Sequence, residues 1–357
     1  MDKLDKATLE SRVKGQSEDV PTITDTDLSH QNYEGIDIKG GFFQKVNFSA
    51  SSLKQANLKE SVFIECDFTE TNFDHAELTE AKFINCCLKQ ACLKEAMLDQ
   101  CNFIDSKLDE SVLDKSSLNN CNFIDCSFVK TRFNHTKASS MSLINAALEE
   151  TDFSGCDFFR TNFMEPKIKL IKFDQAHFNL PFFYQTNLAG VDFRSCILTM
   201  PQFQETELKH CNFSGMEIPQ AGFSGANLTA ANFEGANINN GLFIKANLTG
   251  ANFRRAKLEQ ALLIESTCLS TDFAKAKLYQ AQFSKANCEA SLFPKANLTY
   301  VDFSHANLSY ADMSDTILNS ANLHEIIDYK TLWMGSNKRA AKPTEEPRKD
   351  AEQFKTA

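Results

Sequence analysis

The sequence predicts an all-β fold, a parallel β-helix of stacked four-sided coils, and two periodicities support this prediction. Every fifth residue from Leu28 to Leu323 lies on one apolar repeat without insertion or deletion, and its 60 positions include 27 Phe, 24 Leu and 4 Ile. A period of five fits neither an α-helix, with about 3.6 residues per turn, nor the two-residue alternation of a strand. It therefore indicates a repeat solenoid.

The second period is twenty residues. The positions from Phe43 to Leu323 at this spacing hold 12 Phe in 15, and those ten residues out of phase, from Tyr33 to Met313, hold 10 Phe in 15. The two sets between them are mainly Leu and Ile. A coil of twenty residues explains this sorting, because two opposite sides then carry Phe ladders and the other two carry aliphatic ladders. About fifteen such coils would fill a narrow core at crystal-like density.

The other positions of each five-residue unit fit the same coil. Two residues before each apolar position the side chain is small, as in Ala56, Ala226 and Ala246, so it can point inward without crowding the axis. Asn or Asp often comes directly before the apolar residue, as in Asn247 and Asn252. These side chains bond to nearby backbone and tolerate turn conformations, so one turn in every five residues is expected.

Units such as Ala246-Asn247-Leu248-Thr249-Gly250 and Ala306-Asn307-Leu308 resemble those of the pentapeptide-repeat proteins. The resemblance covers about 300 of the 357 residues. It implies a right-handed quadrilateral β-helix. In the first half of the chain, Cys, Ser or Thr often replaces the small Ala of these units.

The two ends of the chain depart from the repeat. We expect an N-terminal tail or cap over residues 1–22, the β-helix over 23–323, a short C-terminal capping helix over 324–335, and a disordered tail over 336–357. The helix is predicted because Ile326, Ile327, Tyr329 and Trp333 recur at helical spacing after the repeat ends. Some pentapeptide-repeat proteins dimerise through this end, which leaves a homodimer open.

Composition narrows the classes of protein that fit. The first 22 residues lack any long apolar run, so we expect no signal peptide and no membrane span, and a cytoplasmic, bacterial protein. Ten of the twelve cysteines fall on inward or apolar positions, and Cys87 and Cys92 are predicted to face outward. A buried Cys behaves as a small apolar residue, so we interpret these cysteines as part of the packed core. So many free thiols indicate a reducing compartment.

The sequence gives no sign of an enzyme. It contains no Gly-rich phosphate loop, nucleophile elbow, HExxH motif or Cys/His cluster with zinc spacing, and five of the seven His fall on outward, polar positions. An uninterrupted solenoid offers no cleft where catalytic groups could converge. We therefore expect no catalysis, no cofactor and no metal.

One outward column is unusually apolar and predicts a protein-interaction site. Its members lie twenty residues apart and are Ile64, Ile84, Ile104, Ile124, Ile144, Met164 and Tyr184. A partly acidic column lies beside it and includes Glu65, Asp105 and Asp125. Further apolar residues fall on nearby outward positions, at Phe159, Leu170, Leu180 and Phe182. The alternative is that β-branched residues here only help neighbouring coils to pair. Contiguous exposed apolar patches usually mark partners, so an interaction surface is favoured.

Charge raises a second possibility. Residues 60–125 hold 14 Asp/Glu against 5 Lys/Arg, while the whole chain has a net charge of −10. Some pentapeptide-repeat proteins mimic duplex DNA and bind type II topoisomerases. Duplex DNA carries one charge per roughly 1.7 Å, so a mimic about 70 Å long would need on the order of 40 charges. Only residues 60–125 approach this density, and they are interspersed with lysines.

The leading hypothesis is therefore a non-catalytic protein-binding scaffold whose partner docks on the apolar stripe and acidic zone of the N-terminal half. The alternative is a DNA mimic directed at gyrase, and an accessory or effector of a bacterial secretion system is a third. Direct nucleic-acid binding is not expected of an acidic protein. The sequence does not name the partner.

Overall fold

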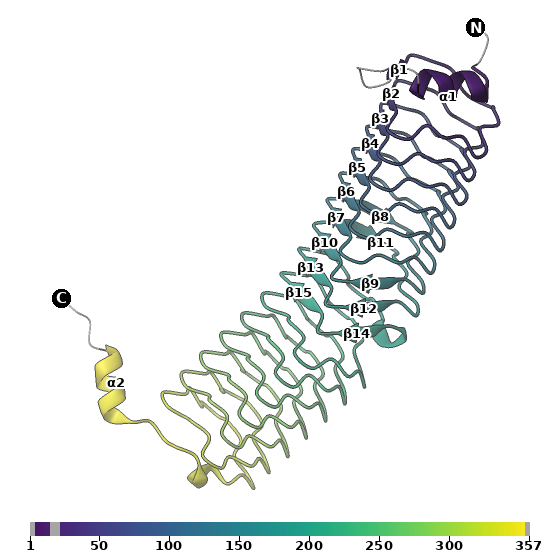
Figure 1. Ribbon diagram of the computed structural model, residues 1–357. Helices are drawn as coiled ribbons and strands as arrows, with labels where there is room; N and C mark the ends of the chain where they lie inside the picture. Colours follow the sequence, from purple (N-terminus) through teal and green to yellow (C-terminus); the bar gives the residue numbers. More distant parts are fainter. Residues whose placement is uncertain (1–3, 15–21, 354–357) are drawn as a thin grey trace. The chain divides into compact units, whose positions relative to one another are not determined.

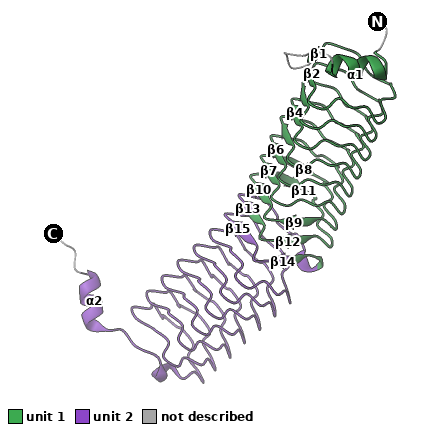
Figure 2. Cartoon of the chain, in the orientation of Figure 1, with its two compact units in different colours: residues 1–182, 195–197 green, residues 183–194, 198–357 purple. Residues whose placement is uncertain are grey.

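The computed structural model describes residues 4–14 and 22–353, which form two compact units. Unit 1 comprises residues 1–182 and 195–197, and unit 2 comprises residues 183–194 and 198–357 (Figure 2). In both units the chain winds as a parallel β-solenoid (Figure 1). No helix in the described ranges is long and apolar enough to cross a bilayer.

Unit 1 contains α1 (Lys6–Lys14) and most of the strands. These strands are three residues long, and they are β1 (Thr22–Thr24), β2 (Phe42–Gln44), β3 (Val62–Ile64), β4 (Lys82–Ile84), β5 (Asn102–Ile104), β6 (Asn122–Ile124), β7 (Ser142–Ile144), β8 (Ala147–Glu149), β9 (Asp157–Phe159), β10 (Asn162–Met164), β11 (Lys167–Lys169) and β12 (His177–Asn179). Unit 2 contains β15 (Gln202–Gln204), η2 (Lys338–Ala340) and α2 (Glu346–Gln353). The boundary between the units falls within β13 (Phe182–Tyr184), η1 (Phe193–Ser195) and β14 (Ile197–Thr199).

Pairing between coils runs at a register of twenty residues, as the sequence period predicts. In unit 1, Phe63 of β3 pairs with Phe83 of β4, and Phe83 pairs with Phe103 of β5. In unit 2 the same register is kept by single bridges, such as the one from Asn227 to Asn247. Four such pairings, five residues apart, occur in each twenty residues. Strands of three residues are enough to hold neighbouring coils together, because every coil repeats the hydrogen bonds of the coil before it.

The turn of each unit of five is a residue in the left-handed region. Every fifth residue from Asp25 to Gly335 has a positive φ, except Ser195, which ends η1. Most of these residues are not glycine, so the conformation carries a steric cost that neighbouring hydrogen bonds must offset. The Asn or Asp before the apolar residue supplies one of them: Asn247 Oδ1 accepts from the Thr249 backbone N–H at 3.1 Å. The expected role of Asn and Asp in the turn is confirmed.

The apolar repeat forms the core, and its Phe ladders stack. Along the ladder from Phe43, successive ring centroids lie 5.1 Å or less apart as far as Phe123. In unit 2 the two ladders also meet edge to face, as Phe233 and Phe253 each do against Phe243. The small inward positions are buried too, and where they carry Thr the hydroxyl is satisfied: Thr271 Oγ1 donates to the Leu248 carbonyl at 2.8 Å.

Within the N-terminal segment, α1 packs on the solenoid. Leu9 and Val13 of α1 are buried, and the Tyr33 hydroxyl donates to the Leu4 carbonyl at 2.7 Å. Lys14 pairs with Asp37 at 2.8 Å. These contacts place α1 against the first coils of unit 1, where core would otherwise be exposed (Figure 1).

The predicted helix over 324–335 and the disordered tail over 336–357 need correction. Residues 324–335 continue the solenoid, because Ile327 and Leu332 bridge to the preceding coil and Glu325, Lys330 and Gly335 keep the left-handed turns. The apolar spacing there is that of one more coil, whose backbone groups pair with the coil before it. Within the predicted tail lie η2 and α2. Residues 354–357 lie outside the described residues.

Candidate protein-interaction surface

The isoleucine stripe is defined as Ile64, Ile84, Ile104, Ile124, Ile144 and Met164, all in unit 1. The structure places these residues at the last position of β3, β4, β5, β6, β7 and β10. Each faces its equivalent in the next strand in parallel register, from Ile64 against Ile84 to Ile144 against Met164. The sequence spacing therefore brings the stripe together in one sheet, as predicted.

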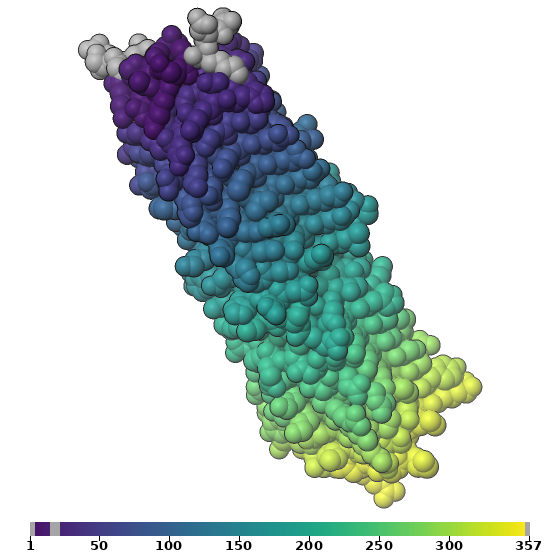
Figure 3. Space-filling model, turned by 90° about the vertical axis from the view of Figure 1, so that its right-hand side faces the viewer, coloured from purple at the N-terminus to yellow at the C-terminus, as the bar shows by residue number. Residues whose placement is uncertain are grey.

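The stripe is half-buried along its whole length, and none of its side chains is among the most exposed apolar residues of the described chain. This burial follows from the ladder itself, since each Ile covers part of its neighbours on the adjoining strands. The accessible parts of these side chains lie in register along one sheet. The space-filling view shows rows of side chains following the coils across the face turned to the viewer (Figure 3).

The acidic column lies directly beside the stripe, because each member follows a stripe residue in the chain. Glu65, Asp105 and Asp125 are exposed and occupy left-handed turns with φ between 49° and 55°. Glu65 lies 3.9 Å from the Lys45 ammonium, and Asp125 accepts a hydrogen bond from the Asn145 amide. The apolar row is thus bordered by carboxylates that retain access to solvent.

Tyr184, the last member of the predicted column, belongs to unit 2. It ends β13, is half-buried, and its hydroxyl accepts a hydrogen bond from Gln185 Nε2 at 3.1 Å. Of the other outward apolar residues, Leu170 and Phe159 are exposed, whereas Leu180 and Phe182 are half-buried. Leu170 lies ten residues, half a coil, from Leu180, so these two residues lie on different sides of the coil.

The acidic zone is partly neutralised by ion pairs within unit 1. The Lys59 ammonium contacts Glu77, Lys89 lies 3.8 Å from Asp109, and the Arg132 guanidinium contacts Asp114. These partners lie about one coil apart along the chain, so adjacent coils bring opposite charges together. The field of the zone is therefore weaker than its count of carboxylates implies.

The C-terminal residues predicted as a cap or dimer contact lie on the last turn of unit 2. Ile327 and Tyr329 are exposed at 57% and 58%, while Ile326 and Trp333 are half-buried. The Lys338 ammonium lies 4.2 Å from the Trp333 ring centroid and shares an open hollow with it. The sequence interpretation missed Leu332 and Met334 of the same turn, which are the most exposed apolar side chains nearby at 60% and 82%. Both sit on outward positions of the repeat, which is the signal that could have identified them.

We define Ile327, Tyr329, Leu332 and Met334 as the terminal-turn surface. A second group that sequence spacing missed comprises His305, His324 and Glu352 of unit 2. The first two belong to neighbouring coils and the third to α2, so no short motif connects them.

The cysteines pack as predicted. Ten of the twelve are buried, Cys87 and Cys92 are half-buried, and all are free thiols. Burial raises the pKa of Cys126, Cys156 and Cys211 to about 12. These three thiols are therefore protonated near neutral pH and unsuited to nucleophilic chemistry.

Two sequence models of pentapeptide repeats match this chain. The model described as "Pentapeptide repeat region" matches residues 36–111, 186–263 and 236–313, which is more than half of the chain. The model described as "Pentapeptide repeats (8 copies)" matches residues 96–134 and 126–163. A search of curated proteins found no match.

Solved structures that resemble this chain do so at low identity. A trypsin-treated form of QnrB1, a plasmid-mediated fluoroquinolone resistance protein, is 14% identical, with 58% of this chain and 90% of that chain covered and a TM-score of 0.44. A pentapeptide repeat protein from the Arabidopsis thaliana thylakoid lumen is 25% identical, with 34% and 68% covered and a TM-score of 0.19. HetL from the cyanobacterium Nostoc, involved in heterocyst differentiation regulation, is 19% identical, with 88% and 90% covered and a TM-score of 0.14.

These TM-scores are low, so the assignment rests on the sequence models and on the five-residue and twenty-residue registers seen throughout both units. The chain belongs to the pentapeptide repeat family.

Proposed function

We propose that this protein is a non-catalytic scaffold that binds a protein partner along the isoleucine stripe and its acidic border. The observation that carries the proposal is the row of in-register apolar side chains from Ile64 to Met164, bordered by the exposed carboxylates of Glu65, Asp105 and Asp125. Apolar contacts that lose water on docking dominate binding energy, and a charged rim selects the partner and speeds encounter.

The double variant Ile104→Thr/Ile124→Thr tests this function. Thr keeps the β-branch that favours the strand but replaces apolar surface with a hydroxyl, so the fold should survive while partner capture from the native host falls. Val112→Thr is the matched control, since Val112 is also half-buried on the outside of unit 1 but outside the stripe. Circular dichroism verifies folding. Capture by the double variant equal to that by wild type would leave the stripe as a device for coil pairing only.

A DNA mimic directed at gyrase is the second candidate, and the excess of 14 Asp/Glu over 5 Lys/Arg in residues 60–125 favours it. The ion pairs at Asp109 and Asp114 weigh against it, because they cancel charge that a mimic would present. Supercoiling assays with purified gyrase, with and without this protein, separate the candidates. A mimic must inhibit or protect the enzyme in a way that weakens steeply with salt.

A role as an accessory or effector of a secretion system is a third candidate and rests on the breadth of the family. Placement in a bacterial cytoplasm is likewise part of the proposal, and localisation of a tagged chain in the native host tests both. Export from the cell would favour the third candidate over the first.

We further infer that each unit winds as a right-handed, four-sided coil, with about fifteen coils in the chain. The four pairings in each twenty residues support four sides. Crossovers between parallel strands are right-handed in roughly 98% of cases, which supports the hand. The terminal-turn surface is our proposed homodimer contact, because it exposes four large apolar side chains on one turn.

A further inference from the structure

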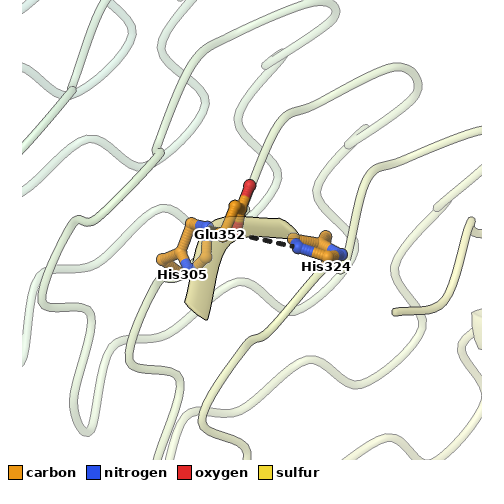
Figure 4. Close-up of side chains that lie close together, drawn as sticks. All are labelled: His305, His324 and Glu352. Atoms are coloured by element: carbon orange, nitrogen blue, oxygen red, sulfur yellow. Dashed lines mark hydrogen bonds and ion pairs between the residues drawn. The ribbon is translucent and has the colours of Figure 1, made fainter. Parts of the chain in front are cut away.

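Three side chains from separate parts of unit 2 converge beside the last coils. His305 and His324 come from neighbouring coils, and Glu352 comes from α2, which brings its carboxylate between the two rings (Figure 4). Glu352 Oε2 lies 3.0 Å from His305 Nε2 and 3.2 Å from His324 Nε2. All three potential ligand atoms lie within 4.8 Å of one another.

This geometry matches a small divalent cation of the zinc class. Zinc binds imidazole nitrogen and carboxylate oxygen at about 2.0–2.1 Å, which sets tetrahedral ligand atoms about 3.3–3.4 Å apart. The two separations from Glu352 fall just short of that value, and all three potential ligand atoms lie within 4.8 Å of one another, so side-chain movements would bring them to ligating positions. His324 is 1% exposed, whereas His305 and Glu352 are 34% and 36% exposed, which gives an ion a route from solvent.

The remaining contacts hold the carboxylate and the helix in place. Arg348 Nε donates to Glu352 Oε1 at 2.8 Å, which leaves Oε2 toward the two rings. Lys349 pairs with Glu325 at 3.2 Å and gives α2 a second tie to the solenoid. The carboxylate is therefore held beside the two rings before any metal arrives. The Arg348 cation works against a second cation nearby, so we expect modest rather than extreme affinity.

One contact changes when a metal binds. The Glu345 backbone N–H donates to His324 Nδ1 at 3.2 Å, so the neutral ring carries its proton on Nε2, facing Glu352. Metal at Nε2 requires the proton to move to Nδ1, and the Glu345 N–H must then turn away. A single hydrogen bond to a backbone amide is a small loss beside the bonds to a metal, so the exchange is favourable.

We propose that His305, His324 and Glu352 form a divalent-metal site of the zinc class that fastens α2 to the last coils of the solenoid. Its fourth position is filled by water, as three protein ligands leave one open. Binding requires an unprotonated ring nitrogen on each histidine.

Calorimetry on the full chain with zinc chloride and with cobalt chloride tests the site. The background variant Cys87→Ser/Cys92→Ser removes the two cysteines that are not fully buried, which could bind metal on their own. One equivalent of zinc should bind. His305→Ala and Glu352→Gln should each weaken binding by at least about 10–100-fold, the loss that mutation of outer-shell partners alone causes.

His75→Ala is the matched control. His75 is an exposed histidine with carboxylates at 3.6 and 3.9 Å, but these face different ring nitrogens and cannot share one ion. The bound cobalt spectrum should lack thiolate charge transfer, and the Glu345 amide should exchange faster with metal than without it. The proposal would be overturned if the background variant bound no zinc, or if His305→Ala and Glu352→Gln bound zinc as tightly as that background. The three side chains would then form only a hydrogen-bonded contact between α2 and the solenoid.

Discussion

The rings of Phe83 and Phe103 lie parallel in the core of unit 1, with an interplanar angle of 1° and centroids 4.6 Å apart. Phe123 continues the stack at 4.9 Å from Phe103, and all three side chains are fully buried. Each ring therefore fills the space between its equivalents in the coils before and after it. The ladder couples neighbouring coils through contacts that no single coil could make.

Removal of one ring from this ladder should leave a cavity. Phe103→Ala should lower the free energy of unfolding by about 3–5 kcal/mol, because the stacked neighbours cannot collapse far along the axis. Chemical denaturation followed by circular dichroism measures the loss. Phe159→Ala is the control, since Phe159 is 37% exposed whereas Phe103 is fully buried. If Phe103→Ala lowers the free energy of unfolding by no more than about 0.5 kcal/mol, as a surface substitution does, the stacking of Phe rings in the core would be contradicted.

The inward hydroxyl of Thr271 should stabilise the coil that precedes it. Thr271 is fully buried and donates to the Leu248 carbonyl, which also accepts from the Ala251 N–H at 2.9 Å. Thr271→Val keeps the shape and removes one hydrogen bond, so we expect a loss of about 0.5–1.5 kcal/mol in denaturation. Thr249→Val, at a turn on the surface, should cost less. A stabilised Thr271→Val variant would show that the hydroxyl has no structural role.

Docking of α1 should weaken in acid. The Lys14 ammonium holds the pKa of Asp37 below its ordinary value, with help from backbone and Asn57 hydrogen bonds. A carboxyl whose pKa is lowered by folding stabilises the folded form above the ordinary value of about 3.9, and the contribution is lost as pH falls through the lowered pKa. Methyl NMR signals of Val13 and Leu9 should report this release.

Asp37→Asn removes the charge and should show weaker docking at neutral pH without the acid step. Retention of the same acid-dependent shift in Asp37→Asn would assign the change to another group.

Self-association through the terminal-turn surface should depend on Ile327 and Leu332. The double variant Ile327→Thr/Leu332→Thr should shift the sedimentation of a dimer toward the monomer, since both side chains are more than half exposed. Ile197→Thr is a closely matched control, because Ile197 is 58% exposed and Ile327 is 57% exposed. If the wild-type protein is a monomer, this dimer contact does not exist. If the double variant is still a dimer, the dimer interface lies at another surface.

The sequence alone determined the coil. The repeats of five and twenty residues predicted which Phe would stack, which cysteines would be buried and which isoleucines would share a face, and the structure places Phe103, Cys126 and Ile104 accordingly. This was possible because each unit of five adopts nearly the same local conformation, so a residue's place in the register fixes its direction and its neighbours.

Only the tertiary structure decided how far the register extends and what lies against it. The sequence interpretation placed Ile326 and Ile327 on a short helix, and the backbone pairing of Ile327 and Leu332 with the preceding coil overturned it. The position of α2 depends on contacts such as Glu352 with His324, residues 28 apart in the chain and outside any repeat. The half-burial of the stripe likewise comes from neighbouring strands. Periodicity predicts contacts between equivalent residues, whereas these arise where the period ends and long-range packing decides.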